Sequence, residues 1–126
     1  MKSLFKNIST ILIWSEDFEK LAKWYLETFE LNIIEEINHP QDTGRLFKIG
    51  NVQLWIGQHS GIKGKNKDPL RIMFNIDVDS VMNVYNYLIS RKVNCIAKPF
   101  KAPTFDKYFA TFSDPDGNVF QLIGGK

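Results

Sequence analysis

The sequence predicts an α+β fold of two tandem βαβββ units whose strands form a curved mixed sheet around a cavity. Three observations support this prediction. One order of expected strands and helices occurs twice in 126 residues. Each expected helix has a single apolar stripe and follows an expected strand. Both halves also close on Gly-Asn-Val followed by Ile-Gly, within residues 50–57 and 117–124. We expect one domain, 1–126, with repeat units at about residues 5–57 and 69–124 and a linker at about 58–68.

The first unit opens with a β-branched, apolar run at residues 8–13, which is typical of a strand. Ser15, Glu16 and Asp17 then supply capping and acidic side chains, which favour the start of a helix. Five apolar residues follow at helical spacing and predict one buried stripe. They are Phe18, Leu21, Ala22, Tyr25 and Phe29.

Three more strands complete the first unit, at residues 32–37, 45–49 and 52–56. Gly50 and Asn51 between the last two indicate a tight hairpin, because both residue types tolerate the backbone angles of a two-residue turn. The polar, Gly- and Lys-rich segment that follows, HSGIKGKNKDP, is interpreted as the linker.

The second unit repeats this order. A strand is expected at residues 70–76 and capping residues at 77–80. The second helical stripe consists of Val81, Val84, Tyr85, Leu88 and Ile89. The remaining strands are expected at residues 95–97, 108–112 and 119–123, with a proline-containing loop at 98–106.

Composition narrows the classes of function. Apolar residues make up 44% and charged residues 24%, which is typical of a globular protein. A net charge of +2 gives no reason to expect nucleic acid or membrane as a partner. The single cysteine, Cys95, excludes an intramolecular disulfide. Together with the lack of a secretory signal or a long apolar run, these features predict a cytoplasmic protein.

The stretch Asp114-Pro115-Asp116-Gly117-Asn118 has the composition of a turn. Asp and Asn side chains bond nearby backbone groups, Pro fixes φ, and Gly accepts positive φ. Turn formation therefore explains the two aspartates without a metal-binding or acid–base role.

With the repeated βαβββ order, this turn and Asp17 with Trp24-Tyr25 make the chain resemble the vicinal-oxygen-chelate superfamily. Its members include glyoxalase I, bleomycin-resistance and fosfomycin-resistance proteins, and extradiol dioxygenases. The resemblance implies a metal site with ligands from four strands. Those positions fall on Thr10, Gln53, Met73 and Gln121. An ungapped match of the two repeats selects Leu54 in place of Gln53, and the sequence leaves both open.

These four residues are a poor ligand set for a catalytic divalent cation. Such ions bind carboxylates or imidazoles, whereas Thr and Gln are neutral and a Met thioether prefers soft metals. We therefore expect no metal and no other cofactor. Catalytic residues stay unassigned, with His59 as a weak candidate for a base.

Strand alternation predicts which side chains face the cavity. The candidate ligand-binding residues are Thr10, Trp14, Gln53, Trp55, Arg71, Met73, Asn75 and Gln121. This set suits a planar or amphipathic small molecule, with Arg71 available for an anionic group. The alternative interpretation is that the tryptophans fill the space and the glutamines bond each other.

The leading hypothesis is a metal-independent protein that binds or sequesters a small molecule, resembling the bleomycin-resistance branch, and that is not an enzyme. The resemblance also implies a homodimer. One alternative is a glyoxalase-like lyase or isomerase, or a dioxygenase-related enzyme, with a displaced metal site or His59 as base. Another is an interaction module whose cavity is filled by its own side chains.

Overall fold

The computed structural model describes residues 4–126 and divides the chain into two compact units between Gly64 and Lys65. Unit 1 contains β1 (Thr10–Ser15), α1 (Phe18–Thr28), β2 (Ile33–His39), β3 (Asp42–Ile49) and β4 (Val52–Gln58). Unit 2 contains β5 (Phe74–Ser80), α2 (Val81–Ser90), β6 (Asn94–Lys101), β7 (Tyr108–Ser113) and β8 (Val119–Gly125). The predicted α+β class with two tandem βαβββ units is confirmed.

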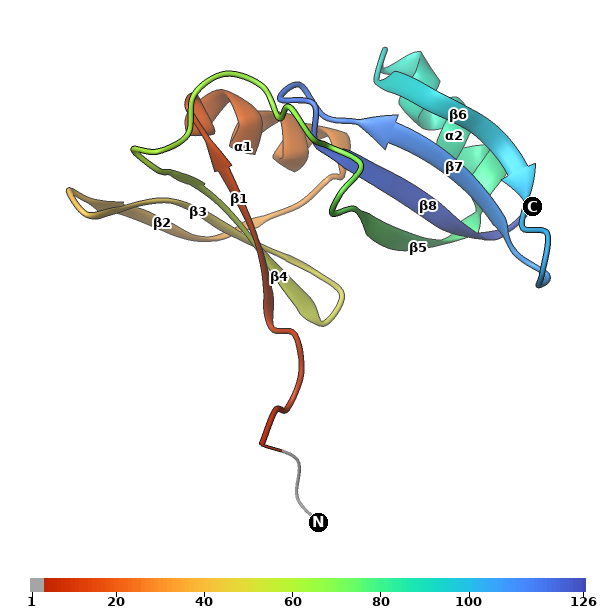
Figure 1. The fold of residues 1–126 in the computed structure, drawn as a ribbon, viewed down its shortest axis with the longest axis horizontal. Coiled ribbons are helices and arrows are strands. Elements are labelled where there is room, and N and C mark those ends of the chain that lie inside the picture. Colours follow the sequence, from red (N-terminus) through yellow and green to blue (C-terminus); the bar gives the residue numbers. More distant parts are fainter. Residues whose placement is uncertain (1–3) are drawn as a thin grey trace. The chain divides into compact units, whose positions relative to one another are not determined.

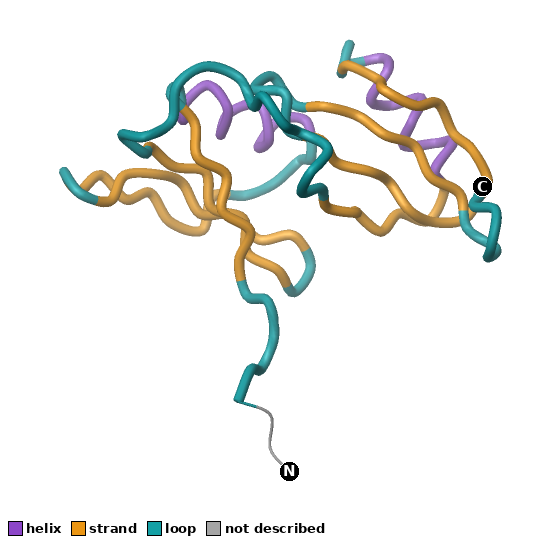
Figure 2. Tube along the Cα trace, in the orientation of Figure 1, coloured by secondary structure: helices purple, strands orange, loops and turns teal. Residues whose placement is uncertain are grey.

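Each unit forms its own four-stranded mixed sheet with one helix (Figures 1 and 2). The strand order is β1-β4-β3-β2 in unit 1 and β5-β8-β7-β6 in unit 2. In both sheets the first and last strands of the unit pair in parallel, and the other neighbours are antiparallel. The repeat seen in the sequence is therefore also a repeat of topology. Among the described residues, neither helix has the length and apolar content needed to cross a membrane.

In unit 1 the core lies between α1 and one face of the sheet. Ile13, Phe47 and Ile56 occupy that face and are at most 7% exposed. Leu21 and Tyr25 of α1 are at most 1% exposed and carry the apolar stripe that the sequence predicted. Burying each large apolar side chain contributes about 1.5–3 kcal/mol, so this contact fixes which face of the sheet the helix covers.

Unit 2 has the equivalent core. Phe112 and Phe120 stack with ring centroids 5.9 Å apart, and both are fully buried. Tyr85 of α2 contacts Phe112 at 6.1 Å between centroids, which places this face of the sheet against α2. Leu88 of the same helix is 2% exposed.

Both helices begin with the side-chain caps that the sequence indicated. The Asp17 carboxylate accepts a hydrogen bond from the backbone N–H of Lys20 at 3.4 Å. The Ser80 hydroxyl accepts one from the backbone N–H of Asn83 at 3.2 Å. Each cap satisfies a backbone donor that has no partner inside its helix.

Both helices also end in the same way. The backbone N–H of Leu31 donates to the carbonyl of Leu26 at 2.9 Å, across Glu30, whose φ is +54°. In unit 2 the equivalent bond is 3.0 Å long and the left-handed residue is Lys92, at φ +62°. This is the Schellman arrangement, in which glycine is the usual residue, so both repeats retain a strained non-glycine residue.

The expected strand at 70–76 is wrong in its first half, because β5 begins only at Phe74. Residues 70–73 instead follow a local turn. The backbone N–H of Arg71 donates to the carbonyl of Asp68 at 3.3 Å, and its Nε donates to the Asp68 carboxylate at 2.6 Å. Leu70 and Ile72, which gave the segment its strand-like pattern, are 66% and 84% exposed.

The expected loop at 98–106 is also partly wrong, because β6 continues through Lys101. Its pairing with β7 shifts register between Ala97 and Phe100, on either side of Pro99. Since β6 is an edge strand, the missing N–H of proline leaves no central hydrogen bond unmade.

The DPDGN segment is a turn built around Asp114, which is 4% exposed. Its Oδ1 accepts from the backbone N–H groups of Asp116 at 2.9 Å and Asn118 at 3.0 Å. Its Oδ2 accepts from the Asn118 side-chain amide at 3.0 Å. The amide of Asn66 in turn donates to Asn118 at 3.0 Å, so the turn also holds part of the linker. Turn formation thus engages both oxygens of Asp114.

We expect Asp114→Ala to destabilise the protein by about 2–3 kcal/mol, because three part-buried donors lose their shared acceptor at once. Chemical denaturation monitored by circular dichroism measures this loss. Asp106→Ala is the matched control, since the Asp106 side chain is 97% exposed and its ion pair with Lys101 is 3.9 Å long. Equal effects of the two substitutions would contradict a structural role for the Asp114 turn.

Candidate functional site

We call the face of each sheet opposite its helix the helix-distal face. In unit 1, strand alternation places Thr10, Leu12 and Trp14 of β1 on this face. Thr10 is in register with Gln53 of β4, and Leu12 with Trp55. Four of the predicted ligand-binding residues therefore share one face of unit 1.

Trp55 packs against its own sheet. A Cβ atom added to Gly44 or Gly57 would overlap the Trp55 ring, so the indole lies on the two glycines. These glycines are paired in register on neighbouring strands β3 and β4. Trp55 is 6% exposed, which leaves little of its ring for a ligand. For this residue the structural alternative, an aromatic ring that fills space, fits the geometry better.

Trp14 is more accessible and contacts His59, with ring centroids 5.3 Å apart in an edge-to-face arrangement. The Nδ1 atom of His59 accepts a hydrogen bond from the backbone N–H of Gly61 at 3.0 Å. A neutral imidazole that accepts at Nδ1 carries its proton on Nε2. His59 in this geometry is therefore a donor toward a ligand, and its basic nitrogen is already engaged.

Thr10 and Gln53 form a polar pair on the same face. The Thr10 hydroxyl donates to Gln53 Oε1 at 3.3 Å. The neighbouring residue Leu54 is 1% exposed and belongs to the face that α1 covers. Of the two positions that the sequence left open, Gln53 is thus the one on the helix-distal face.

Unit 2 carries a matching polar group. Gln121 of β8 is in register with Asn75 of β5 and with Thr111 of β7. Its amide Nε2 donates to the Thr111 hydroxyl at 3.1 Å. Gln53 and Gln121 therefore each bond to a threonine on an adjacent strand of their own sheet.

Two predicted residues of unit 2 lie outside the strand on which they were expected. Arg71 and Met73 precede β5, so the register that aligns Asn75 with Gln121 does not include them. The Arg71 side chain is 76% exposed and pairs with Asp68. Within β5, Asn75 is the residue in register with Gln121.

A cluster of aromatic side chains on unit 2 was missed by the sequence reasoning. Phe100 and Phe109 stack with ring centroids 5.8 Å apart, and Phe105 meets Phe109 edge to face at 5.9 Å. Phe109 is in register with Ile123 on the helix-distal face. Phe100 and Phe105 are 43% and 49% exposed. The high aromatic content of residues 100–109, FKAPTFDKYF, was the feature of the sequence that could have indicated this cluster. Most of this segment was instead expected to be a loop.

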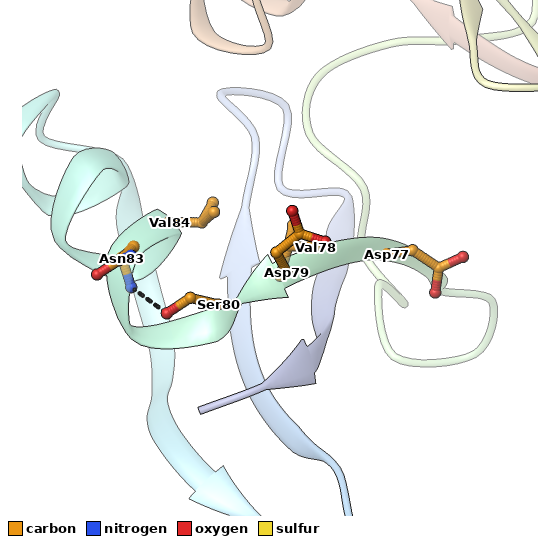
Figure 3. Close-up of a pocket in the computed structure, with 6 residues that line it drawn as sticks. All are labelled: Asp77, Val78, Asp79, Ser80, Asn83 and Val84. Carbon is orange, nitrogen blue, oxygen red and sulfur yellow. Dashed lines mark hydrogen bonds between the residues drawn. The ribbon is translucent and has the colours of Figure 1, made fainter.

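A shallow hollow lies at the end of β5, where α2 begins (Figure 3). It is lined by Asp77, Asp79, Ser80 and Asn83, together with two valines. Ser80 is already bonded to the backbone of Asn83. The carboxylates of Asp77 and Asp79 point in different directions, so they do not converge on one ligand (Figure 3).

Cys95 has the features of a structural thiol. Burial raises its pKa above the ordinary value for cysteine, and this effect outweighs the lowering by the charge of Lys98 and a backbone hydrogen bond. A raised pKa disfavours the nucleophilic thiolate. A structural role is therefore favoured over a nucleophilic one for Cys95.

A repeated βαβββ unit, with polar side chains at matching places on the two helix-distal faces, is the architecture of the vicinal-oxygen-chelate class. Residues 7–122 match the family model described as the Glyoxalase/Bleomycin resistance protein/Dioxygenase superfamily. The chain belongs to this superfamily, as the sequence resemblance predicted. Among curated proteins, none matches the chain.

Solved structures agree on the fold. SMU.1112c superposes with a TM-score of 0.80 at 20% identity, over 94% of this chain and 98% of that one. A glyoxalase family protein from Enterococcus faecalis gives 0.79 at 20% identity, over 96% and 99%. The fosfomycin resistance protein FosX from Listeria monocytogenes gives 0.75 at 14% identity, over 98% and 96%. At these identities the likeness concerns the fold alone.

The residues at the superfamily's metal positions do not fit a divalent cation. The resemblance places these positions on Thr10 and Gln53 in unit 1 and on Met73 and Gln121 in unit 2. All four side chains are neutral, so none offsets the cost of desolvating the ion. Among residues 4–126, no three His, Cys, Asp or Glu side chains gather elsewhere as a substitute. No chemical step is therefore assigned to a metal here.

We expect Gly57→Ala to destabilise the protein by about 1–3 kcal/mol, because the added methyl group displaces the Trp55 ring. Thermal unfolding of the single variant measures the cost. In a Trp55→Leu background the same substitution is expected to cost less, since the overlapping ring is gone. A cost that is unchanged by Trp55→Leu would show that the ring does not require glycine at this position.

Proposed function

We propose that this protein binds a small, planar or amphipathic molecule on its helix-distal faces without a divalent metal. The observation that carries the proposal is the neutrality of the residues at the superfamily's metal positions, described above. Neutral amides and hydroxyls orient a ligand by hydrogen bonds but do not stabilise the charge that develops during catalysis as a metal does. Binding or sequestration is therefore favoured over turnover.

The aromatic residues supply the apolar part of this proposed site. Phe100, Phe105 and Phe109 present partly exposed rings beside the Gln121–Thr111 pair. An aromatic pair contributes about 0.5–1.5 kcal/mol in addition to the free energy gained by burying its apolar area. Such contacts suit a ligand with a flat ring. On unit 1 the half-buried Trp14 and the donor Nε2 of His59 offer a similar combination.

The enzyme hypothesis with His59 as base has weaker support. A general base needs an accessible lone pair, and the Nδ1 lone pair of His59 accepts from Gly61. His59 serves better to donate a hydrogen bond to a carbonyl or carboxylate of a bound molecule. The fosfomycin resistance protein among the structural neighbours marks antibiotic-like compounds as one ligand class to test.

We also propose that the chain forms a homodimer. Support comes from the segment before β1, which extends from its sheet (Figure 2). Leu4, Phe5 and Ile8 in this segment are 92%, 86% and 80% exposed. A second copy of the chain is a suitable partner for Leu4 and Ile8, because these apolar side chains are largely exposed to solvent in a single chain.

Metal retention tests the metal-independent part of the proposal. After exposure to Zn²⁺, Ni²⁺, Mn²⁺ and Fe²⁺ and dialysis, we expect far less than stoichiometric metal by plasma mass spectrometry. The matched variant Asn75→His with Gln121→Glu places an imidazole and a carboxylate in register and is expected to retain more. Near-stoichiometric metal in the unaltered protein would overturn the proposal and make glyoxalase and dioxygenase assays the next step.

Ligand binding is tested by titrating the protein with quinoline and indole and following backbone amide signals by NMR. We expect shifts at Phe109, Thr111 and Gln121, and about tenfold weaker binding in Phe109→Leu, which loses the central ring of the cluster. Lys92→Gln, on the loop after α2, is the control. Shifts spread evenly over the chain, or the same affinity in Phe109→Leu, would contradict binding at this face.

The dimer is tested by light scattering coupled to size-exclusion chromatography. We expect twice the 14.6 kDa chain mass, and a shift toward monomer when Leu4, Phe5 and Ile8 are all replaced by Ser. A monomeric mass for the unaltered chain at micromolar concentration would contradict this proposal. A stable dimer of the triple variant would place the interface elsewhere.

A further inference from the structure

A small groove in unit 1 lies outside the proposed ligand-binding face. It runs between α1 and the strands β2 and β3, on the side of the sheet that α1 covers, and we call it the α1–β2 groove. Its volume is about 200 Å³. It is lined by Glu19, Ala22, Lys23, Leu26, Ile33, Arg45 and Phe47.

The groove lies where α1 leaves part of its sheet uncovered. A helix with its side chains is about 10–12 Å across, whereas four strands at about 4.8 Å spacing span more. In unit 1, α1 packs mainly on β1, β3 and β4, and the edge strand β2 is exposed along most of its length. In unit 2, α2 packs against all four strands. The two repeats therefore differ at this place.

The floor of the groove is apolar. Phe47 is fully buried and Ala22 is 4% exposed, and Ile33, paired in register with Phe47, is 39% exposed. Pockets that enclose drug-sized ligands measure roughly 300–1,000 Å³, so this groove suits a smaller molecule. A short hydrocarbon chain or a single ring matches such a floor.

Arg45 is the charged residue of the groove that is most shielded from water, with a side chain only 15% exposed. Its Nη1 donates to Asn38 Oδ1 at 3.1 Å and to the carbonyl of Gly44 at 2.9 Å, and its guanidinium lies over the Phe18 ring at 5.3 Å. Its Nε lies 3.7 Å from a Glu36 carboxylate oxygen, which is beyond hydrogen-bonding distance.

Arginine has five N–H donors, and Nε with Nη2 forms one edge of its planar fork. Among the described residues, no acceptor lies within hydrogen-bonding distance of this edge of Arg45. A carboxylate fits such an edge with two parallel hydrogen bonds. A shielded cation with unused donors, next to an apolar floor, is complementary to an anion with an apolar tail.

We propose that the α1–β2 groove binds small amphipathic monocarboxylates, with the carboxylate on Arg45 and the apolar tail over Phe47, Ala22 and Ile33. Glu36, whose side chain is 57% exposed, competes with the ligand carboxylate for Arg45. Lys23 lies at the rim and pairs with Glu27 at 3.9 Å, and Glu19 lines the same groove with a negative charge. This site is independent of the proposed function, because its residues lie on the opposite face of the sheet.

The test is a titration of the full chain with hexanoate, followed by amide signals in NMR spectra. Hexan-1-ol and hexylamine are the matched probes with the same tail and a neutral or positive head. We expect hexanoate to bind in the millimolar range, to shift signals within residues 19–26, 33 and 45–47, and to bind about tenfold more tightly than either matched probe.

Two substitutions at exposed positions test the charges without threatening the fold. Glu36→Gln removes the competing carboxylate and is expected to tighten hexanoate binding by up to about fivefold. Lys23→Glu reverses the charge at the rim and is expected to weaken it about threefold. Arg45→Lys keeps the charge but loses the planar fork, so binding should fall although the protein still folds.

Equal affinity for hexanoate, hexan-1-ol and hexylamine would overturn the proposal, because it would reveal apolar adsorption without recognition of the anion. Hexanoate shifts confined to other parts of the chain would overturn it as well. Weaker binding in Glu36→Gln would show that Glu36 does not compete for Arg45, which also contradicts the proposal.

Discussion

One helix for each four-stranded sheet is the constraint on which the rest of this structure depends. A sheet has two faces, and successive side chains of every strand alternate between them. In each unit the helix buries one face, and among residues 4–126 no other helix or sheet of the same unit packs as a layer on the opposite face. Each sheet must therefore place different chemistry on its two faces, apolar beneath the helix and mixed on the helix-distal face.

The two repeats meet this constraint with different side chains. On unit 1 the indole of Trp55 lies against Gly44 and Gly57 and is 6% exposed. On unit 2, Phe100 stacks on Phe109 and Phe105 meets Phe109 edge to face, while Phe100 and Phe105 are 43% and 49% exposed. The same backbone thus presents one aromatic residue that is already packed and one aromatic cluster that retains accessible surface.

The sequence predicted the fold well because strand and helix periodicities are local properties. The capping residues Asp17 and Ser80 and the DPDGN turn were also readable, since their hydrogen bonds join residues close in the chain. The errors arose where a competing local interaction decided the structure. Asp68 holds Arg71 in a turn that overrides the strand-like pattern of residues 70–73, and an edge position lets β6 continue past Pro99.

The candidate site was only partly predictable, because burial depends on residues far apart in sequence. Nothing near Trp55 in the chain indicates that Gly44, on another strand, makes room for its ring. Nor does the sequence show that α1 leaves β2 uncovered while α2 reaches every strand of its sheet. The pairing of the strands in the structure provides this information, because it places Gln53 on the helix-distal face and pairs Asn75 with Gln121.

The aromatic residues of the two helix-distal faces differ in how much apolar area they leave for the proposed ligand to cover. A ring that is already buried contributes little binding free energy when a ligand covers it, because the hydrophobic contribution scales with the apolar area newly removed from water. Trp55, at 6% exposure, has almost no such area left, whereas Phe100 and Phe105 each retain more than two fifths of theirs. For the proposed ligand binding, the helix-distal face of unit 2 therefore offers more free apolar area than that of unit 1. The face of unit 1 offers mainly hydrogen-bonding groups, which are the Nε2 donor of His59 and the Thr10–Gln53 pair.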